Sequence, residues 1–122
     1  NQFFVYNSYS ESDMGYMVNG EKIALPISTN QIVAHPTATI VLLTENSFKS
    51  KVSNEVLPVD FLVLASDNSF SVTELTTFFQ PKEIVIDASI GRYSAAKIKI
   101  ECEKLNIAFY DISDSGAFLV NF

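Results

Sequence analysis

The sequence predicts a mixed α/β (α+β) fold, in which an antiparallel meander of short strands precedes a β-α-β-α-β-β unit. Residues 61–65 and 84–86 are continuous apolar runs, which is typical of strands buried on both faces of a sheet. Apolar residues after each run recur at helical spacing. Asn19-Gly20 lies between two short apolar stretches and predicts a hairpin, because both central positions of a type I′ turn need positive φ.

The first half of the chain is expected to supply the antiparallel part of one mixed sheet. Its strands are predicted at residues 3–6, 14–18, 21–25 and 38–43. Pro26 ends the meander, and residues 27–37, with the only histidine and several Ser, Thr and Asn residues, are expected to be irregular. The polar stretch 44–55 is expected to be exposed, with room for a helical turn.

A first helix is predicted from Ser71 to Phe79. Ser71 and Glu74 have the spacing of a capping box, in which the two side chains satisfy amides at the start of a helix. Gln80-Pro81 is expected to end this helix, because proline lacks an amide hydrogen and disfavours helix in the residue before it. The apolar residues on its buried face are Val72, Leu75 and Phe79.

A second helix is predicted between Ser94, as its N-cap, and Leu105, with Asn106 in the left-handed C-cap conformation. Its buried stripe consists of Ala95, Ile98, Cys102 and Leu105, and its charged residues form a solvated face. Cys102 is the only cysteine, so no intrachain disulfide is possible, and a small buried hydrophobe is expected there. The last strands are predicted at 108–112 and 117–122, with a turn at 114–116.

Composition indicates one domain of 122 residues with a packed core, because 48% of the residues are hydrophobic. The net charge of −6, with eight unclustered Lys and Arg residues, argues against DNA binding by this chain alone. No run approaches the roughly 18 apolar residues that cross a bilayer, so a soluble domain is expected. The chain starts in a strand-like segment, and we expect it to be an excised C-terminal fragment of a longer protein.

Three carboxylates follow or end predicted strands: Asp67, Asp87 and Asp111. Ligands of open α/β sheets bind at the carboxyl ends of strands, so these residues are the candidate catalytic groups. Together they could hold Mg²⁺ or Mn²⁺ and activate water against a phosphodiester. The alternative is that Asp and Ser side chains at strand ends form local backbone hydrogen bonds and cap helices. The candidate ligand-binding residues of the same loops are Ser66, Asn68, Ser89, Arg92 and Tyr93.

Other site chemistry is not supported by the residues. Zinc needs imidazole or thiolate ligands, and His35 and Cys102 are single and distant in sequence. His35 is expected to be a structural residue. No glycine-rich phosphate loop and no Ser-His-Asp set can be assembled. No cofactor and no resident metal are therefore predicted.

From Val59 onward the chain resembles the end of ComEC-type competence proteins. Asp60, Pro81-Lys82, Arg92-Tyr93 and Gly116-Ala117 lie where that pattern has them, as does the segment 102–107. The resemblance covers about half the chain and implies half of a metallo-β-lactamase-like fold. The family consists of polytopic bacterial inner-membrane proteins that pass single-stranded DNA inward during natural transformation.

The departures from that family bear on activity. Its HxHxDH motif is missing, and Ser66-Asp67-Asn68 stands where the family has His-His. The resemblance therefore implies a non-catalytic domain that packs against the parent channel, forms homo-oligomers or contacts other competence proteins. The alternative is a metal-dependent nuclease that uses the strand-end carboxylates. The side of the membrane that the domain faces is left open.

Overall fold

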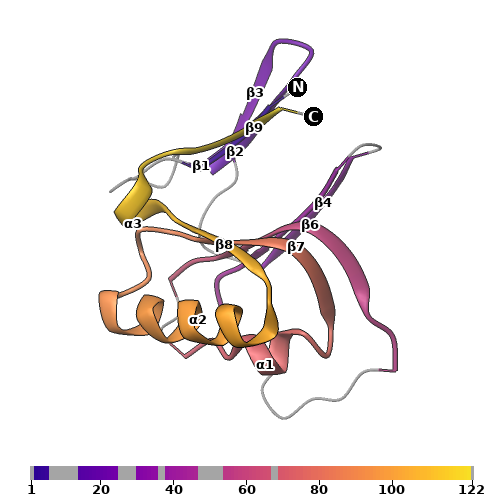
Figure 1. Ribbon diagram of the computed structural model, residues 1–122. Coiled ribbons are helices and arrows are strands. Elements are labelled where there is room, and N and C mark those ends of the chain that lie inside the picture. Colours follow the sequence, from indigo (N-terminus) through magenta and orange to yellow (C-terminus); the bar gives the residue numbers. More distant parts are fainter. Residues whose placement is uncertain are drawn as a thin grey trace.

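The computed structural model describes residues 2–5, 14–24, 30–35, 38–46, 54–66 and 69–121. Within them the chain forms two β-sheets and three helices, arranged in three layers (Figure 1). A five-stranded mixed sheet lies in the middle. A four-stranded antiparallel sheet covers one of its faces, and helices α1 (Val72–Leu75) and α2 (Arg92–Leu105) cover the other. The predicted α/β class is confirmed.

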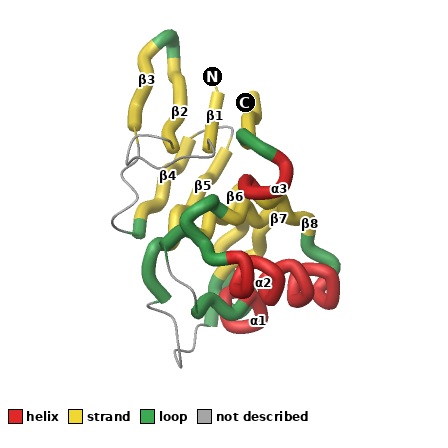
Figure 2. Tube along the Cα trace, turned by 90° about the vertical axis from the view of Figure 1, so that its left-hand side faces the viewer, coloured by secondary structure: helices red, strands yellow, loops and turns green. Residues whose placement is uncertain are grey.

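The central sheet has the strand order β4-β5-β6-β7-β8 (Figure 2). Its strands are β4 (Gln31–His35), β5 (Ala38–Leu43), β6 (Leu57–Leu64), β7 (Phe79–Ile86) and β8 (Ala108–Asp111). β4 runs antiparallel to β5, and the other neighbours are parallel. The carboxyl ends of β6, β7 and β8 therefore meet at one edge, as the sequence predicts for the candidate site.

The second sheet has the strand order β3-β2-β1-β9, and every neighbouring pair is antiparallel. Its strands are β1 (Gln2–Val5), β2 (Met14–Val18), β3 (Glu21–Ala24) and β9 (Phe118–Asn121). Asn19 and Gly20 join β2 to β3 with φ values of 52° and 83°, which confirms the predicted hairpin. The prediction of one mixed sheet is wrong, because the meander and the last strand form a sheet of their own.

Alternation along the central strands explains why two layers cover this sheet. Leu62 and Leu64 belong to the apolar cluster under α1 and α2, whereas Val63 belongs to the cluster that also contains Phe3 and Phe118. Successive residues of a strand point to opposite faces, so a continuous apolar run needs an apolar cover on both sides. The helices cover one face, and the inner face of the four-stranded sheet covers the other.

The first helix is shorter than predicted, and Pro81 lies inside a strand. Helix α1 ends after one turn, and the hydroxyls of Thr76 and Thr77 donate hydrogen bonds to the carbonyls of Thr73 and Glu74 at its end. β7 then begins at Phe79. At Pro81 this strand pairs only with β6, because its pairing with β8 starts at Glu83. Proline is tolerated there since one side of the strand needs no donor.

Three further element boundaries differ from the prediction. Residues 31–35, expected to be irregular, form β4, and 112–115 form helix α3 (Ile112–Ser115) in place of a strand end and a turn. Helix α2 starts three residues early, with Gly91 rather than Ser94 as N-cap. Asn106 adopts the predicted left-handed C-cap, with φ 57° and ψ 44°. Most of the stretch 44–55 lies outside the described residues.

Candidate functional site

Asp87 follows β7 at the carboxyl edge of the central sheet and is buried. Its Oδ2 accepts a hydrogen bond from the Ser89 amide at 3.0 Å and another from the Ser89 hydroxyl. The Ser89 Oγ in turn accepts a hydrogen bond from the Ser66 amide at 2.9 Å, and Ser66 has a positive φ of 67°. Asp87 and Ser89 thus tie the end of β7 to the loop that follows β6.

Asp111 ends β8 and is also buried. Its Oδ1 accepts a hydrogen bond from the Ser113 amide at 2.9 Å, which makes Asp111 the N-cap of α3. Its Oδ2 lies 2.6 Å from the Nζ of Lys99 on α2, and the same ammonium lies 2.5 Å from the Oδ2 of Asp114. Hydrogen bonds to Asp111 and Asp114 raise the pKa of Lys99, and the bond from Lys99 lowers the pKa of Asp114.

The two buried carboxylates lie at neighbouring strand ends but start on opposite faces of the sheet. Asp111 is paired in register with Ile86, whose side chain belongs to the helix-side cluster, and Asp87 is the next residue after Ile86. Asp67 and Asn68 lie outside the described residues. Among the residues that are described, no group of three or more His, Cys, Asp or Glu side chains could hold a metal ion.

A concavity of about 460 Å³ opens between the start of α2, the end of β8 and α3. It contains the Lys99 ion pairs together with the predicted ligand-binding residue Arg92, so cationic and anionic groups balance within it. Tyr93, the other residue predicted from that loop, is 86% exposed in the first turn of α2. The lining residues are Ala88, Ile90, Gly91, Arg92, Ala95, Ala96, Lys99, Asp111, Ser113 and Asp114.

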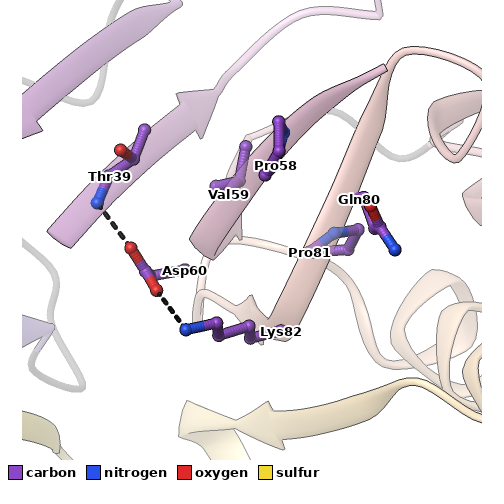
Figure 3. A pocket seen from close by; sticks show the side chains of 7 residues that line it. All are labelled: Thr39, Pro58, Val59, Asp60, Gln80, Pro81 and Lys82. Carbon is purple, nitrogen blue, oxygen red and sulfur yellow. Dashed lines mark hydrogen bonds and ion pairs between the residues drawn. The ribbon is translucent and has the colours of Figure 1, made fainter.

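A second concavity, also of about 460 Å³, lies near the opposite end of the parallel strands (Figure 3). Asp60 on β6 is at its centre. Its Oδ2 accepts a hydrogen bond from the Thr39 amide of β5 at 2.7 Å, and its Oδ1 lies 3.0 Å from the Nζ of Lys82 on β7. The Thr39 hydrogen bond first, and the Lys82 ammonium second, lower the pKa of Asp60 despite its partial burial. Asp60 therefore joins three neighbouring strands.

We expect Asp60→Ala to lower the free energy of unfolding by about 1–2 kcal/mol at pH 7, because the Thr39 amide loses its acceptor. The folded pKa of Asp60 lies below the ordinary value of 3.8, so its stabilisation is present above pH 3.8 and is lost as the pH falls through the folded value. Urea unfolding at pH 7 and at pH 3 should show a smaller difference from the wild type at pH 3.

Lys82→Ala is the matched control for that measurement. The Lys82 side chain is 81% exposed, so solvent screens its ion pair and its loss should cost no more than about 0.5 kcal/mol. Equal effects of the two substitutions would contradict the dominant role of the Thr39 hydrogen bond.

Sequence reasoning missed the role of Lys99 and Asp114. The sequence places Lys99 on the solvated face of the second helix and Asp114 in a turn, yet the two meet Asp111 at the sheet edge. One signal was available: Lys99 is four residues after the buried Ala95, so it lies at the border of the apolar stripe. Cys102 is fully buried as predicted, and burial together with the charges of Glu101 and Glu103 raises the pKa of its thiol to about 11.

The fold and the polar clusters around Asp87 and Asp111 define a mixed α/β domain whose strand-end carboxylates are held by backbone amides, a serine and a lysine. The chain belongs to the ComEC C-terminal domain family, whose model matches residues 1–122, the whole chain. Neither the curated proteins nor the solved structures give a significant match. In the described part of the chain, no helix has the length and apolar character required to cross a bilayer.

Proposed function

We propose that this chain is a non-catalytic domain of a ComEC-type membrane protein that takes up DNA during natural transformation. Family membership supports the connection with competence. The observation that supports a non-catalytic role is that the strand-end carboxylates already bind side chains and amides of the protein itself. Asp87 is bound by Ser89, and Asp111 is bound by the Ser113 amide and the Lys99 ammonium. A metal ion at Asp111 would have to compete with the Lys99 ammonium, and Ser89 leaves only Oδ1 of Asp87 without a hydrogen bond from its own loop.

The proposed role is structural or interactive. The domain packs against the rest of the parent protein, pairs with a second copy or contacts another competence protein. The parent protein is proposed to reside in the bacterial inner membrane. We also propose that the scaffold derives from half of a metallo-β-lactamase-like fold, because Asp60, Pro81-Lys82 and Gly116-Ala117 keep the order and spacing of that pattern. Ser66 stands at the first of the positions where the pattern has histidines.

A second candidate function is a Mg²⁺- or Mn²⁺-dependent nuclease. The observation that favours it is the placement of two buried carboxylates, Asp87 and Asp111, at adjacent strand ends. Hard divalent cations prefer oxygen ligands of this kind. The nuclease would need a third ligand, for which the sequence offers Asp67, and it would need Lys99 to leave Asp111.

Thermal unfolding in the presence of Mg²⁺, Mn²⁺ or Zn²⁺ tests the two functions against each other. We expect no increase in Tm for the wild type. A metal present at 100 times its Kd for a single native site would add about 2.7 kcal/mol of stability, which raises the Tm by several degrees. Such an increase, lost in Asp87→Ala but kept in the exposed control Glu103→Gln, would overturn the non-catalytic proposal.

A nuclease assay with single- and double-stranded DNA and the same metals completes the test. We expect no cleavage above that of a sample without protein. Cleavage that disappears in Asp67→Asn and persists in Glu103→Gln would establish the nuclease in its place, because Asp67 is the candidate third ligand.

A further inference from the structure

Helix α2 is basic, although the chain as a whole is acidic. It holds four of the eight Lys and Arg residues and two acids, which gives the helix a net charge of +2 and leaves −8 for the rest of a chain with −6 in all. Three side chains of one face pack toward the central sheet: Ala95, Ile98 and Cys102. α2 forms an outer layer of the molecule, so its opposite face is turned away from both sheets (Figure 1).

The outward face of α2 combines apolar and basic side chains. Its members recur at positions i, i+4, i+7 and i+11 of the helix: Tyr93, Lys97, Ile100 and Lys104. Tyr93 is 86% exposed and Ile100 is 52% exposed, and both lysines are exposed as well. No ion pair of the described part of the chain involves either lysine. We call these four residues the outer face of α2.

We propose that the outer face of α2 binds an anionic lipid surface. The two ammonium groups attract anionic headgroups, and the lysine stems can lie along apolar surface. Tyrosine is enriched where headgroups meet acyl chains, because its ring is apolar and its hydroxyl is polar. Ile100 would be removed from water at the same boundary. Helices that lie in a membrane interface likewise combine lysine with aromatic and aliphatic side chains.

The shape of this face favours a lipid surface over a nucleic acid. Single strands are bound in positively charged grooves, in which bases stack on aromatic rings. Neither concavity described above includes Tyr93 or Ile100, which lie on the convex outside of a helix. A 14-residue helix is about 21 Å long, and a planar surface can contact it along that length. Ile100 also gains nothing from a phosphate backbone, whereas an acyl boundary removes it from water.

The acidity of the remaining chain weakens this contact without preventing it. Charges further apart than the Debye length of about 8 Å are largely screened at physiological salt, so the groups nearest the lipid dominate. Glu103 and Arg92, both exposed on α2, offset each other. Each lysine of the outer face then contributes about a fivefold gain in partition. Binding of the isolated chain is therefore weak, but in a parent protein held in the bilayer the same contact is intramolecular.

Vesicle flotation tests the proposal with the chain itself. At low salt we expect the chain to float with vesicles of phosphatidylglycerol, to stay behind with vesicles of phosphatidylcholine alone, and to be released by high salt. No flotation with the phosphatidylglycerol vesicles overturns the proposal. The inference rests on the proposed membrane residence of the parent protein and adds lipid to the partners named above. A negative result would leave the non-catalytic role untouched, because that role is tested separately with metals.

Lys97→Glu separates the outer face of α2 from the overall charge. It replaces an attractive charge with a repulsive one, so we expect it to lower the partition to phosphatidylglycerol vesicles at least about tenfold. The Tm should change little, since Lys97 is exposed. Lys22→Glu is the matched control: it changes the net charge by the same amount on β3, in the other sheet. Equal losses in the two variants would show that net charge alone governs the binding, and would refute the proposal.

Ile100→Ser separates lipid from other polyanions. We expect it to weaken binding to phosphatidylglycerol vesicles severalfold, because Ile100 would no longer gain from the acyl boundary. Ile23→Ser is the matched control, since Ile23 is 39% exposed on β3, and it should leave vesicle binding unchanged. Vesicle binding that is insensitive to Ile100→Ser, together with equal binding of the wild type to polyglutamate or single-stranded DNA, would mean a general anion surface and would overturn the assignment to lipid.

Discussion

Phe118→Ala is expected to lower the free energy of unfolding by about 3–5 kcal/mol, the range for removing a buried aromatic side chain. Phe118 on β9 is nearly buried, and its ring contacts the rings of Phe3, Phe61 and Tyr110 with centroid distances of 6.3, 5.4 and 5.0 Å. These rings come from both sheets. Removing the Phe118 ring leaves a cavity between the two layers that their backbones cannot close.

Urea unfolding followed by circular dichroism measures this loss. Domains of this size have total stabilities of about 5–15 kcal/mol, so the substitution should remove a large fraction of the total. Leu119→Ala is the matched control on the same strand, because Leu119 is 49% exposed and its truncation should cost less than about 1 kcal/mol. Similar small effects of both substitutions would show that β9 does not pack against the central sheet.

Lys99→Met is expected to lower the free energy of unfolding by about 2–3 kcal/mol at pH 7. The Asp111 side chain is 7% exposed and would be left without its cation, and removing one partner of a buried ion pair is strongly destabilising. The Lys99 side chain is 25% exposed, so we expect a smaller loss of stability than for a fully buried ion pair. Lys97→Met, at an exposed position of the same helix, should change the stability by no more than about 0.5 kcal/mol.

The pH dependence of this pair has a definite sign. The folded pKa of Lys99 is raised above its ordinary value of 10.5, so its stabilisation is complete below pH 10.5 and is lost as the pH rises through the folded value. The difference between the wild type and Lys99→Met should therefore be constant from pH 7 to 10 and narrow at higher pH. A difference that narrows already between pH 7 and 9 is incompatible with the Lys99 ion pairs described above.

Local sequence signals predicted those features that depend on a few neighbouring residues. Asn19-Gly20 predicted the hairpin because only particular residues adopt two positive φ values in succession. Asn106 predicted the end of α2 because asparagine is one of the few residues that readily adopt the left-handed conformation of a helix C-cap. The runs 61–65 and 84–86 predicted the central strands, and Asp87 and Asp111 were correctly placed at strand ends.

Features that depend on partners distant in sequence were predicted less well. Pro81 was expected to end a helix, but it lies inside strand β7. A proline fits there because the pairing of β7 with β8 starts only at Glu83, so no amide hydrogen is needed at Pro81 on that side. Residues 31–35 have no strong strand pattern and become β4 through pairing with β5. The ligands of the Lys99 ammonium, Asp111 and Asp114, are brought to it by the packing of α2 against β8 and α3.

By itself, the sequence determined the α/β class, the hairpin, the buried strands and the C-terminal cap of the second helix, because each of these follows from backbone preferences and apolar periodicity within a short window. The tertiary structure alone decided that the meander and β9 form a separate sheet, and that the strand-end carboxylates are held by Ser89 and Lys99. Both outcomes depend on which apolar faces and which charges meet in space, and no local window of the sequence contains that information.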